Sequence, residues 1–179
     1  MKINCIKVGY LECNCYILEK DNQVIVIDPG DEYFKIKPYL EEKEVLAILI
    51  THRHFDHVGA LNKVLEDYPV KVYEYNNLEE KEYILGNFKF KVMFTLGHTL
   101  DSISFYFYED NTMFTGDFLF EGTIGRTDFK ESDVSLMKKS LIKIKEYSLD
   151  LDIYPGHGAK TTLNREKKYN PYLQEDINI

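Results

Sequence analysis

A segment of six residues near position 52 carries an unusual density of side chains that bind metal ions. It contains His52, His54, Asp56 and His57. Imidazole nitrogens and carboxylate oxygens are common ligands of zinc, iron and manganese in proteins. In an extended stretch His52 and His54 project to the same side, whereas Asp56 and His57 turn away as a helix begins. One short loop can therefore present two ligands to each of two neighbouring ions.

Three further candidate ligands are spread along the rest of the chain. His98, Asp117 and His157 each come just after a predicted strand, and all five histidines fall at such junctions. A single histidine on a loop is most often a solvated surface residue, but five placed in this way indicate a site. We therefore predict that these side chains bind metal: His52, His54, Asp56, His57, His98, Asp117 and His157.

The types of the predicted ligands indicate what kind of metal site they form. None of the seven is a cysteine, whereas closed structural zinc sites usually recruit thiolates. An open catalytic site is therefore the better interpretation. We expect two zinc ions as cofactors, with iron or manganese as alternatives.

The elements that would position these ligands are mainly short strands. Apolar periodicity predicts helices near residues 33–43, where Pro38 limits regularity, just after His57, over 134–144 with Ser132 as N-cap, and near 165–173. Strands are predicted over residues 3–8, 15–19, 24–28, 45–50, 70–75, 88–95, 103–108, 112–115 and 152–154.

The order of these elements predicts an α/β fold. Runs of strands closed by a helix occur in both halves, and no Gly-, Ser- or Pro-rich linker separates them. Two mixed β-sheets packed face to face, with helices outside, would bury every apolar face. We predict a single domain spanning residues 1–179.

Composition and charge exclude several classes of partner. The net charge is −8 and only three of the 22 basic residues are arginines, so nucleic acid is a poor partner. No stretch approaches the ~20 apolar residues of a membrane span, and the first ten residues contain no apolar run of signal-peptide length. The cysteine count is odd, at three, which is atypical of a disulfide framework. We expect a cytoplasmic protein with a small-molecule substrate; its oligomeric state is left open.

The ordered set of motifs resembles the metallo-β-lactamase superfamily. The pattern His-x-His-x-Asp-His, a later His, a later Asp and a final His is matched in order, and four short stretches look like the glyoxalase II-like (hydroxyacylglutathione hydrolase-like) branch: 14–16, 27–30, 125–128 and 170–173. The resemblance implies a four-layer αββα sandwich. It also implies a first metal held by His52, His54 and His98, a second held by Asp56, His57 and His157, and a bridging Asp117.

The resemblance also separates the branches of that superfamily. His54 stands where flavodiiron relatives carry a glutamate, and no cysteine occupies a ligand position, so the hydrolase branch is favoured. Glyoxalase II enzymes add a C-terminal helical domain that helps to hold glutathione, whereas 22 residues follow His157 here. The thiol part of the substrate is therefore left open.

The chemistry of the predicted ligands favours hydrolysis of a small thioester, such as a hydroxyacyl thiol ester. A hydroxide shared by two ions would be the nucleophile at neutral pH. With every histidine bound to metal, none protonates the leaving group, which matters little for a thiolate because thiols have a pKa of ~8.5. Asp56 is the candidate for any catalytic proton relay.

Three other functions fit parts of the pattern. An iron-dependent persulfide dioxygenase would use a single iron bound by His52, His98 and Asp117. The remaining two are a non-catalytic metal-binding protein and an RNA phosphodiesterase, which the acidic net charge disfavours.

Residues outside the ligand set have two interpretations each. Arg126 and Asp128 are the candidate substrate-binding pair, and a structural ion pair is the equally weighted alternative. Asp28 ends a strand near the same edge. It either bonds the second nitrogen of a metal-bound histidine or caps a turn.

Overall fold

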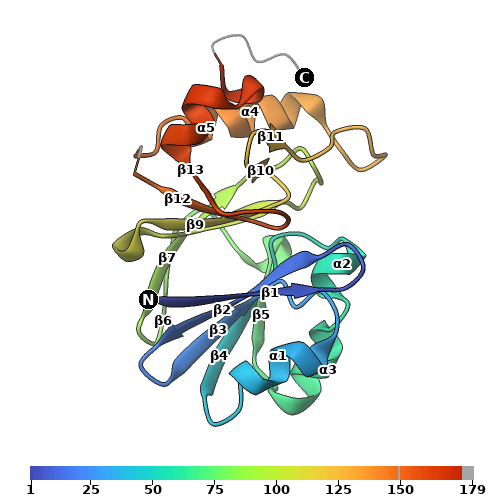
Figure 1. Cartoon of the computed structure of the whole chain (residues 1–179), viewed down its shortest axis with the longest axis vertical. Helices are drawn as coiled ribbons and strands as arrows, with labels where there is room; N and C mark the ends of the chain where they lie inside the picture. The colour runs from blue at the N-terminus through green and yellow to red at the C-terminus, as the bar shows by residue number, and fades with distance from the viewer. Residues whose placement is uncertain (149, 175–179) are drawn as a thin grey trace.

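The strands of the computed structural model, which describes residues 1–148 and 150–174, form two mixed sheets (Figure 1). The first has the order β1 (Lys2–Val8), β2 (Cys13–Lys20), β3 (Gln23–Ile27), β4 (Glu44–Leu49), β5 (Lys71–Tyr73). The second has the order β13 (Thr161–Thr162), β12 (Asp152–Pro155), β9 (Thr112–Gly116), β8 (Ile103–Phe107), β7 (Phe88–Phe94), β6 (Glu82–Leu85). A small hairpin, β10 (Leu119–Phe120) and β11 (Thr123–Ile124), lies beside them.

Helices cover the outer face of each sheet, as Figure 1 shows. On the first sheet lie α1 (Tyr33–Ile36), α2 (Phe55–Val58) and α3 (Leu61–Asp67). On the second lie α4 (Val134–Ile144) and α5 (Leu163–Tyr169). Single 3₁₀ turns complete the chain: η1 (Lys37–Tyr39), η2 (Tyr75–Asn77), η3 (Tyr108–Asp110) and η4 (Pro171–Leu173).

Three hydrophobic clusters separate these layers. Alternation along β2 sends Ile17 to the helix-facing cluster and Leu18 to the cluster between the sheets. That central cluster is rich in phenylalanine, including Phe90, Phe105 and Phe114. The third cluster joins the second sheet to α4 and α5. The predicted four-layer αββα sandwich is therefore confirmed.

Several element boundaries differ from the prediction for local reasons. The helix expected over residues 33–43 ends at Ile36 and continues as a 3₁₀ turn, in which Pro38 cannot donate a helical hydrogen bond. The N-cap of α4 is Asp133 rather than Ser132, since its carboxylate accepts from the Leu136 amide. Ser132 instead donates to the His98 carbonyl. The strands β6, β10, β11 and β13 were not predicted; β10, β11 and β13 have only two residues each.

Strand direction brings the ends of distant strands to one edge of the sandwich. β3 and β4 are parallel, and so are β9 and β12. β7 runs in the same direction as β9, because both are antiparallel to β8 between them. The loops that follow β3, β4, β7, β9 and β12 therefore meet at one rim, and each carries a candidate ligand or Asp28.

A buried carboxylate fastens the β10–β11 hairpin to α5. Glu166 is fully buried and accepts hydrogen bonds from the Gly122 amide at 2.7 Å and the Thr161 hydroxyl at 2.5 Å. Asn170 donates to Glu166 and to the Thr123 carbonyl, at 3.0 Å each. This network holds the hairpin that lines the cleft described below.

None of the helices within residues 1–148 and 150–174 has the length and apolar character needed to cross a membrane.

Replacing Glu166 with alanine should destabilise the fold by about 3 kcal/mol, because buried donors lose their acceptor. Burial acts to raise the pKa of Glu166, but its hydrogen bonds hold that pKa below the usual value. Its contribution is therefore complete above the ordinary glutamate pKa and is lost as the pH falls through the depressed value. Urea unfolding at several pH values measures both effects. The exposed Glu146→Ala is the control, and equal losses in both variants would contradict the expectation.

Candidate metal centre

The loops at this rim bring all seven predicted ligands together. His52, His54, Asp56 and His57 come from the segment between β4 and the end of α2. The other three follow β7, β9 and β12: His98, Asp117 and His157. Their donor atoms form two groups, and within each group the atoms lie within 4.8 Å of one another.

The first group consists of three imidazole nitrogens and one carboxylate oxygen. His54 Nδ1 lies 3.1 Å from His52 Nε2 and 3.1 Å from His98 Nε2. Asp117 Oδ2 lies 3.6 Å from His98 Nε2. Around a tetrahedral zinc ion with Zn–N bonds of 2.0–2.1 Å, neighbouring ligand atoms are about 3.3 Å apart. The separations therefore fit ligands that share one ion.

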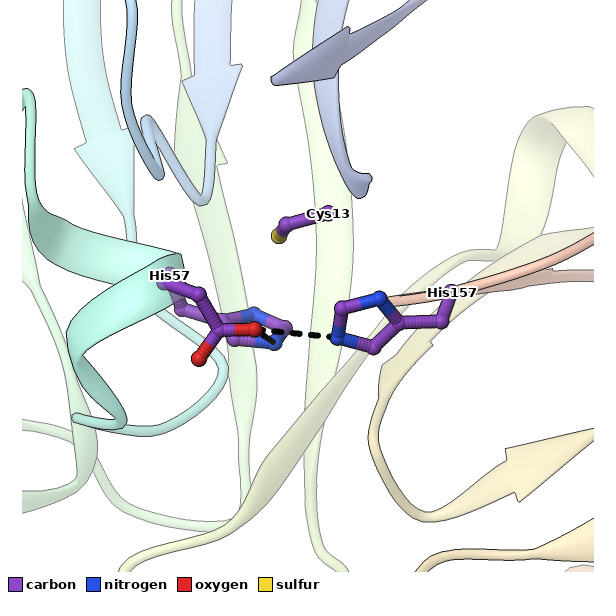
Figure 2. Close-up of side chains that lie close together, drawn as sticks. Cys13, His57 and His157 are labelled. Carbon is purple, nitrogen blue, oxygen red and sulfur yellow. Dashed lines mark ion pairs between the residues drawn. The ribbon is translucent and has the colours of Figure 1, made fainter. Parts of the chain in front are cut away.

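The second group lies next to the first and includes a residue that the sequence analysis missed. Asp56 Oδ2 lies 3.1 Å from His157 Nε2 and 3.8 Å from His57 Nε2. The fourth member is Cys13, at the start of β2 (Figure 2). The sequence analysis expected no cysteine among the ligands, because Cys13 is remote in sequence from the other candidates. It lies in this group because β2 packs against α2, which carries Asp56 and His57.

Asp117 lies between the two groups. Its Oδ1 is 3.4 Å from His57 Nε2, and its Oδ2 is 3.6 Å from both His98 Nε2 and His157 Nε2. One carboxylate thus faces nitrogens of both groups, which is the position that a bridging ligand needs.

Each histidine has one ring nitrogen that points away from the cluster, and the hydrogen-bond partner of this outer nitrogen determines which of the two nitrogens carries the proton. Four of these outer nitrogens face carbonyl or carboxylate oxygens, which can only accept, and the fifth faces a hydroxyl whose own proton is donated to Asp28. The pairs, at 2.9–3.3 Å, are His52–Thr51, His54–Glu131, His57–Asp28, His98–Arg126 carbonyl and His157–Leu11 carbonyl. In the neutral ring, each inner nitrogen therefore presents a lone pair to the cluster.

Two buried polar atoms of this cluster lack a hydrogen-bond partner in the described part of the chain. Among the described residues, His57 Nε2 and Asp117 Oδ1 have no hydrogen-bond partner, although both are inaccessible to solvent. An unpaired buried polar atom costs about 1–3 kcal/mol. A cation between them would satisfy both, so the residues fit a metal ion.

Electrostatics at the cluster also favour a cation. Burial disfavours the charged form of His57, yet Asp28 and Asp117 hold its pKa well above the usual histidine value. Burial, together with the neighbouring imidazoles, holds the pKa of His52 well below that value, so this ring stays neutral as a ligand must. Burial raises the pKa of the Cys13 thiol to about 11. The negative potential that favours a proton at His57 would equally favour a metal cation.

Asp28 supports the cluster from behind. Its Oδ2 accepts from His57 Nδ1 at 2.9 Å and from the Thr51 hydroxyl at 2.6 Å, and its Oδ1 accepts from the Thr51 amide at 2.8 Å. The residue adopts a left-handed conformation, with φ of 49°. Of the two predicted roles, the hydrogen bond to a candidate ligand is present.

The loop that carries His157 is pinned to the first sheet. Asn14 Nδ2 donates to the carbonyls of Pro155 and Gly158, at 3.0 and 3.1 Å, and the Tyr16 hydroxyl donates to the Pro155 carbonyl at 2.5 Å. A Cβ at Gly156 would overlap Asp117 Oδ1 and the His57 ring. These contacts explain why the sequence carries Asn14 and Tyr16 on β2 and a glycine before His157.

The two groups open into a cleft of about 520 Å³ with largely apolar walls. Asp56, His157 and Asp117 reach its floor. Its apolar walls come from the loop after β1, from α2, from the β10–β11 hairpin and from the segment between β11 and α4: Leu11, Phe55, Phe120, Ile124 and Phe129. Substrate can therefore approach the candidate ligands from one side.

The two residues of the predicted substrate-binding pair differ in their position relative to the cleft. Arg126 lines the cleft, and its guanidinium lies 4.4 Å from the Phe129 ring centre. Asp128 accepts two hydrogen bonds from Arg126, at 2.8 and 2.9 Å, and is not among the cleft-lining residues in the described part of the chain. The structural ion pair of the alternative is therefore present, and a substrate role stays a prediction.

Comparison with known families agrees with this fold. The chain matches the model of the metallo-beta-lactamase superfamily over residues 8–82 and 74–157, and it belongs to that superfamily. Its members are generally hydrolytic metalloenzymes.

Individual relatives cover almost the whole chain. A probable metallo-hydrolase of Bacillus subtilis, YqgX, is 33% identical, with 97% of this chain and 98% of the relative covered. The hydroxyacylglutathione hydrolase GloC of Haemophilus influenzae is 31% identical, with the same coverage. Among solved structures, the BLEG-1 B3 metallo-beta-lactamase has 30% identity and a TM-score of 0.92, covering 96% of this chain and 99% of that one. TTHA1623 in a di-iron-bound form has 31% identity and a TM-score of 0.88, covering 95% and 100%.

Replacing Asp28 with asparagine should weaken zinc binding at the second group by about 10- to 100-fold, since it removes the charge that orients His57. Asparagine tolerates the left-handed backbone at this position, so the fold should persist. Competition with a chromogenic chelator measures the affinity. The exposed Asp21→Asn serves as a control, and unchanged affinity in Asp28→Asn would refute the supporting role.

Proposed function

We propose that this chain is a hydrolase of small thioesters that uses two metal ions, with zinc as the first choice. The superfamily and the two adjacent ligand groups support a two-metal hydrolase. The similarity to GloC, named as a hydroxyacylglutathione hydrolase, supports a thioester. In this proposal the first ion is held by His52, His54 and His98, the second by Asp56, His57 and His157, and Asp117 is shared.

The observation that carries the choice of a thioester is the hydrogen bonding of the five histidines. Every outer ring nitrogen already bonds to an oxygen of the described residues, and every inner nitrogen faces the cluster. No imidazole is then free to protonate a leaving group. An amine leaving group needs that proton, whereas a thiolate with a parent pKa of ~8.5 leaves without it.

The protein's own residues position the reaction at the floor of the cleft. When bound, divalent ions would polarise the substrate carbonyl and lower the pKa of water toward ~7. Asp56 lines the cleft and its Oδ2 lies 3.1 Å from His157 Nε2, so we assign to it any proton relay to the departing group. Apolar walls that include Phe55 and Phe129 would hold the acyl part and exclude water from it.

The thiol part of the substrate would lie toward the exposed rim. Arg126 lines the cleft, and its cationic guanidinium is solvent-exposed. We propose that Arg126 binds a carboxylate of the thiol part and that Asp128 orients it through the paired hydrogen bonds. This assignment does not distinguish glutathione from smaller acidic thiols.

An iron-dependent persulfide dioxygenase is the second candidate. A di-iron form of the similar TTHA1623 favours iron. A single iron at His52, His98 and Asp117 would leave the lone pairs of the second group without a cation. We therefore rank the two-metal hydrolase first, and oxygen uptake with a persulfide substrate separates the two, because a hydrolase consumes no oxygen.

We further propose a cytoplasmic location with a small-molecule substrate and no nucleic-acid partner. The three cysteines are free thiols, which fits a reducing compartment, and the net charge of −8 supports the absence of a nucleic-acid partner.

The zinc-loaded protein should hydrolyse a small hydroxyacyl thioester, and Asp117→Asn should lower kcat/KM on the order of 10³-fold, as expected for losing several kcal/mol of metal-assisted catalysis. Thiol release followed with a chromogenic disulfide measures this rate. Asp67→Asn, far from the cleft, should retain full activity. The same assay with the matched amide and a phosphodiester should give no turnover. Wild-type activity no higher than that of Asp117→Asn would overturn the proposal.

A further inference from the structure

We propose that Cys13 is a thiolate ligand of the second metal ion, which makes that site a sulfur-containing one. This inference rests on the proposed two-metal function and extends it to the choice of metal. The ligand set becomes Cys13, Asp56, His57 and His157.

The geometry of Cys13 carries the inference. Its Sγ and the donor atoms of the other three residues lie within 4.8 Å of one another. Figure 2 shows the side chain of Cys13, at the start of β2, close to the imidazole rings of His57 and His157. The cysteine is fully buried, so its sulfur faces protein atoms rather than solvent.

A separate observation indicates that a cation belongs beside this sulfur. The side chain of His57 is fully buried, and its Nε2 has no hydrogen-bond partner among the described residues. Its Nδ1 is already bonded to Asp28, so the lone pair on Nε2 is directed at the group that contains Cys13. A bound ion would satisfy this atom and the thiolate together.

The other two cysteines provide a contrast within the same sheet. Cys15 lies two residues along β2, is fully buried in the same hydrophobic cluster and does not belong to either ligand group in the described part of the chain. Cys5 is exposed on β1. Position 13 therefore differs from position 15 in the cluster of ligands that it faces and not in burial.

Ligation by sulfur would make the two metal positions unequal. When the ion binds, the sulfur–hydrogen bond breaks, the proton leaves to solvent, and the sulfur electron pair forms the bond to metal, so no oxidant is required. Thiolate is a soft ligand that favours zinc, whereas the first group offers imidazole and carboxylate, which also suit iron and manganese. The second position should therefore select zinc more strongly than the first.

Cobalt substitution tests the proposal directly. Wild-type protein loaded with two equivalents of Co²⁺ should show a near-ultraviolet charge-transfer band from thiolate to cobalt. Cys13→Ser should lose this band while keeping the visible bands of cobalt in the first site, and Cys15→Ser, the matched buried control, should keep it. In chelator competition, Cys13→Ser should lower zinc affinity at one of two sites by at least about tenfold.

The outcomes separate this inference from the proposed function. Two bound ions and thioesterase activity without the charge-transfer band would overturn sulfur ligation and leave the hydrolase intact. Binding of fewer than two ions by the wild type would overturn both. Because the band is read on the wild type, the test stands even if Cys13→Ser folds poorly, and Cd²⁺-loaded wild type offers a second thiolate band.

Discussion

The structure depends on holding five imidazole lone pairs and two carboxylates within a few ångströms of one another. Groups of this kind repel each other and lose their hydration when buried, so they stay together only if a cation joins them or the surrounding fold fixes them in place. Here the fold fixes them: each ring is oriented through its outer nitrogen by an oxygen atom of another residue. The resulting arrangement is complementary to positive charge before any ion binds.

The residues that hold the ligand loops in place connect the two sheets, so the geometry of the candidate metal site depends on how the sheets pack. Asp28, at the end of β3, holds His57 and Thr51 of the neighbouring loop. Asn14 and Tyr16, on β2, hold the carbonyl of Pro155, which ends β12 in the other sheet. Each ligand group takes residues from both sheets, so the packing of one sheet on the other sets the distances between ligands within each group.

The two ligand groups differ in the types of donor atom that they offer to a metal ion. The first presents three imidazole nitrogens, whereas the second combines imidazoles with Asp56 and the buried sulfur of Cys13. Asp117 contacts nitrogens of both groups and couples them electrostatically. An ion in either position therefore changes the field at the other, and the cleft exposes both to the same bound molecule.

The sequence by itself determined the fold class, the family and the convergence of the ligand loops, because period-two alternation and ligand types at strand ends are local signals. It did not reveal that Cys13 joins His57, since that contact depends on how β2 lies against α2 rather than on spacing. Nor did it decide between the two roles of Asp28 or place Asp128 outside the cleft lining described. Those features follow from sheet packing and long-range hydrogen bonds. Contacts between residues far apart in the chain produce no periodic pattern in the sequence, so the sequence alone does not predict them.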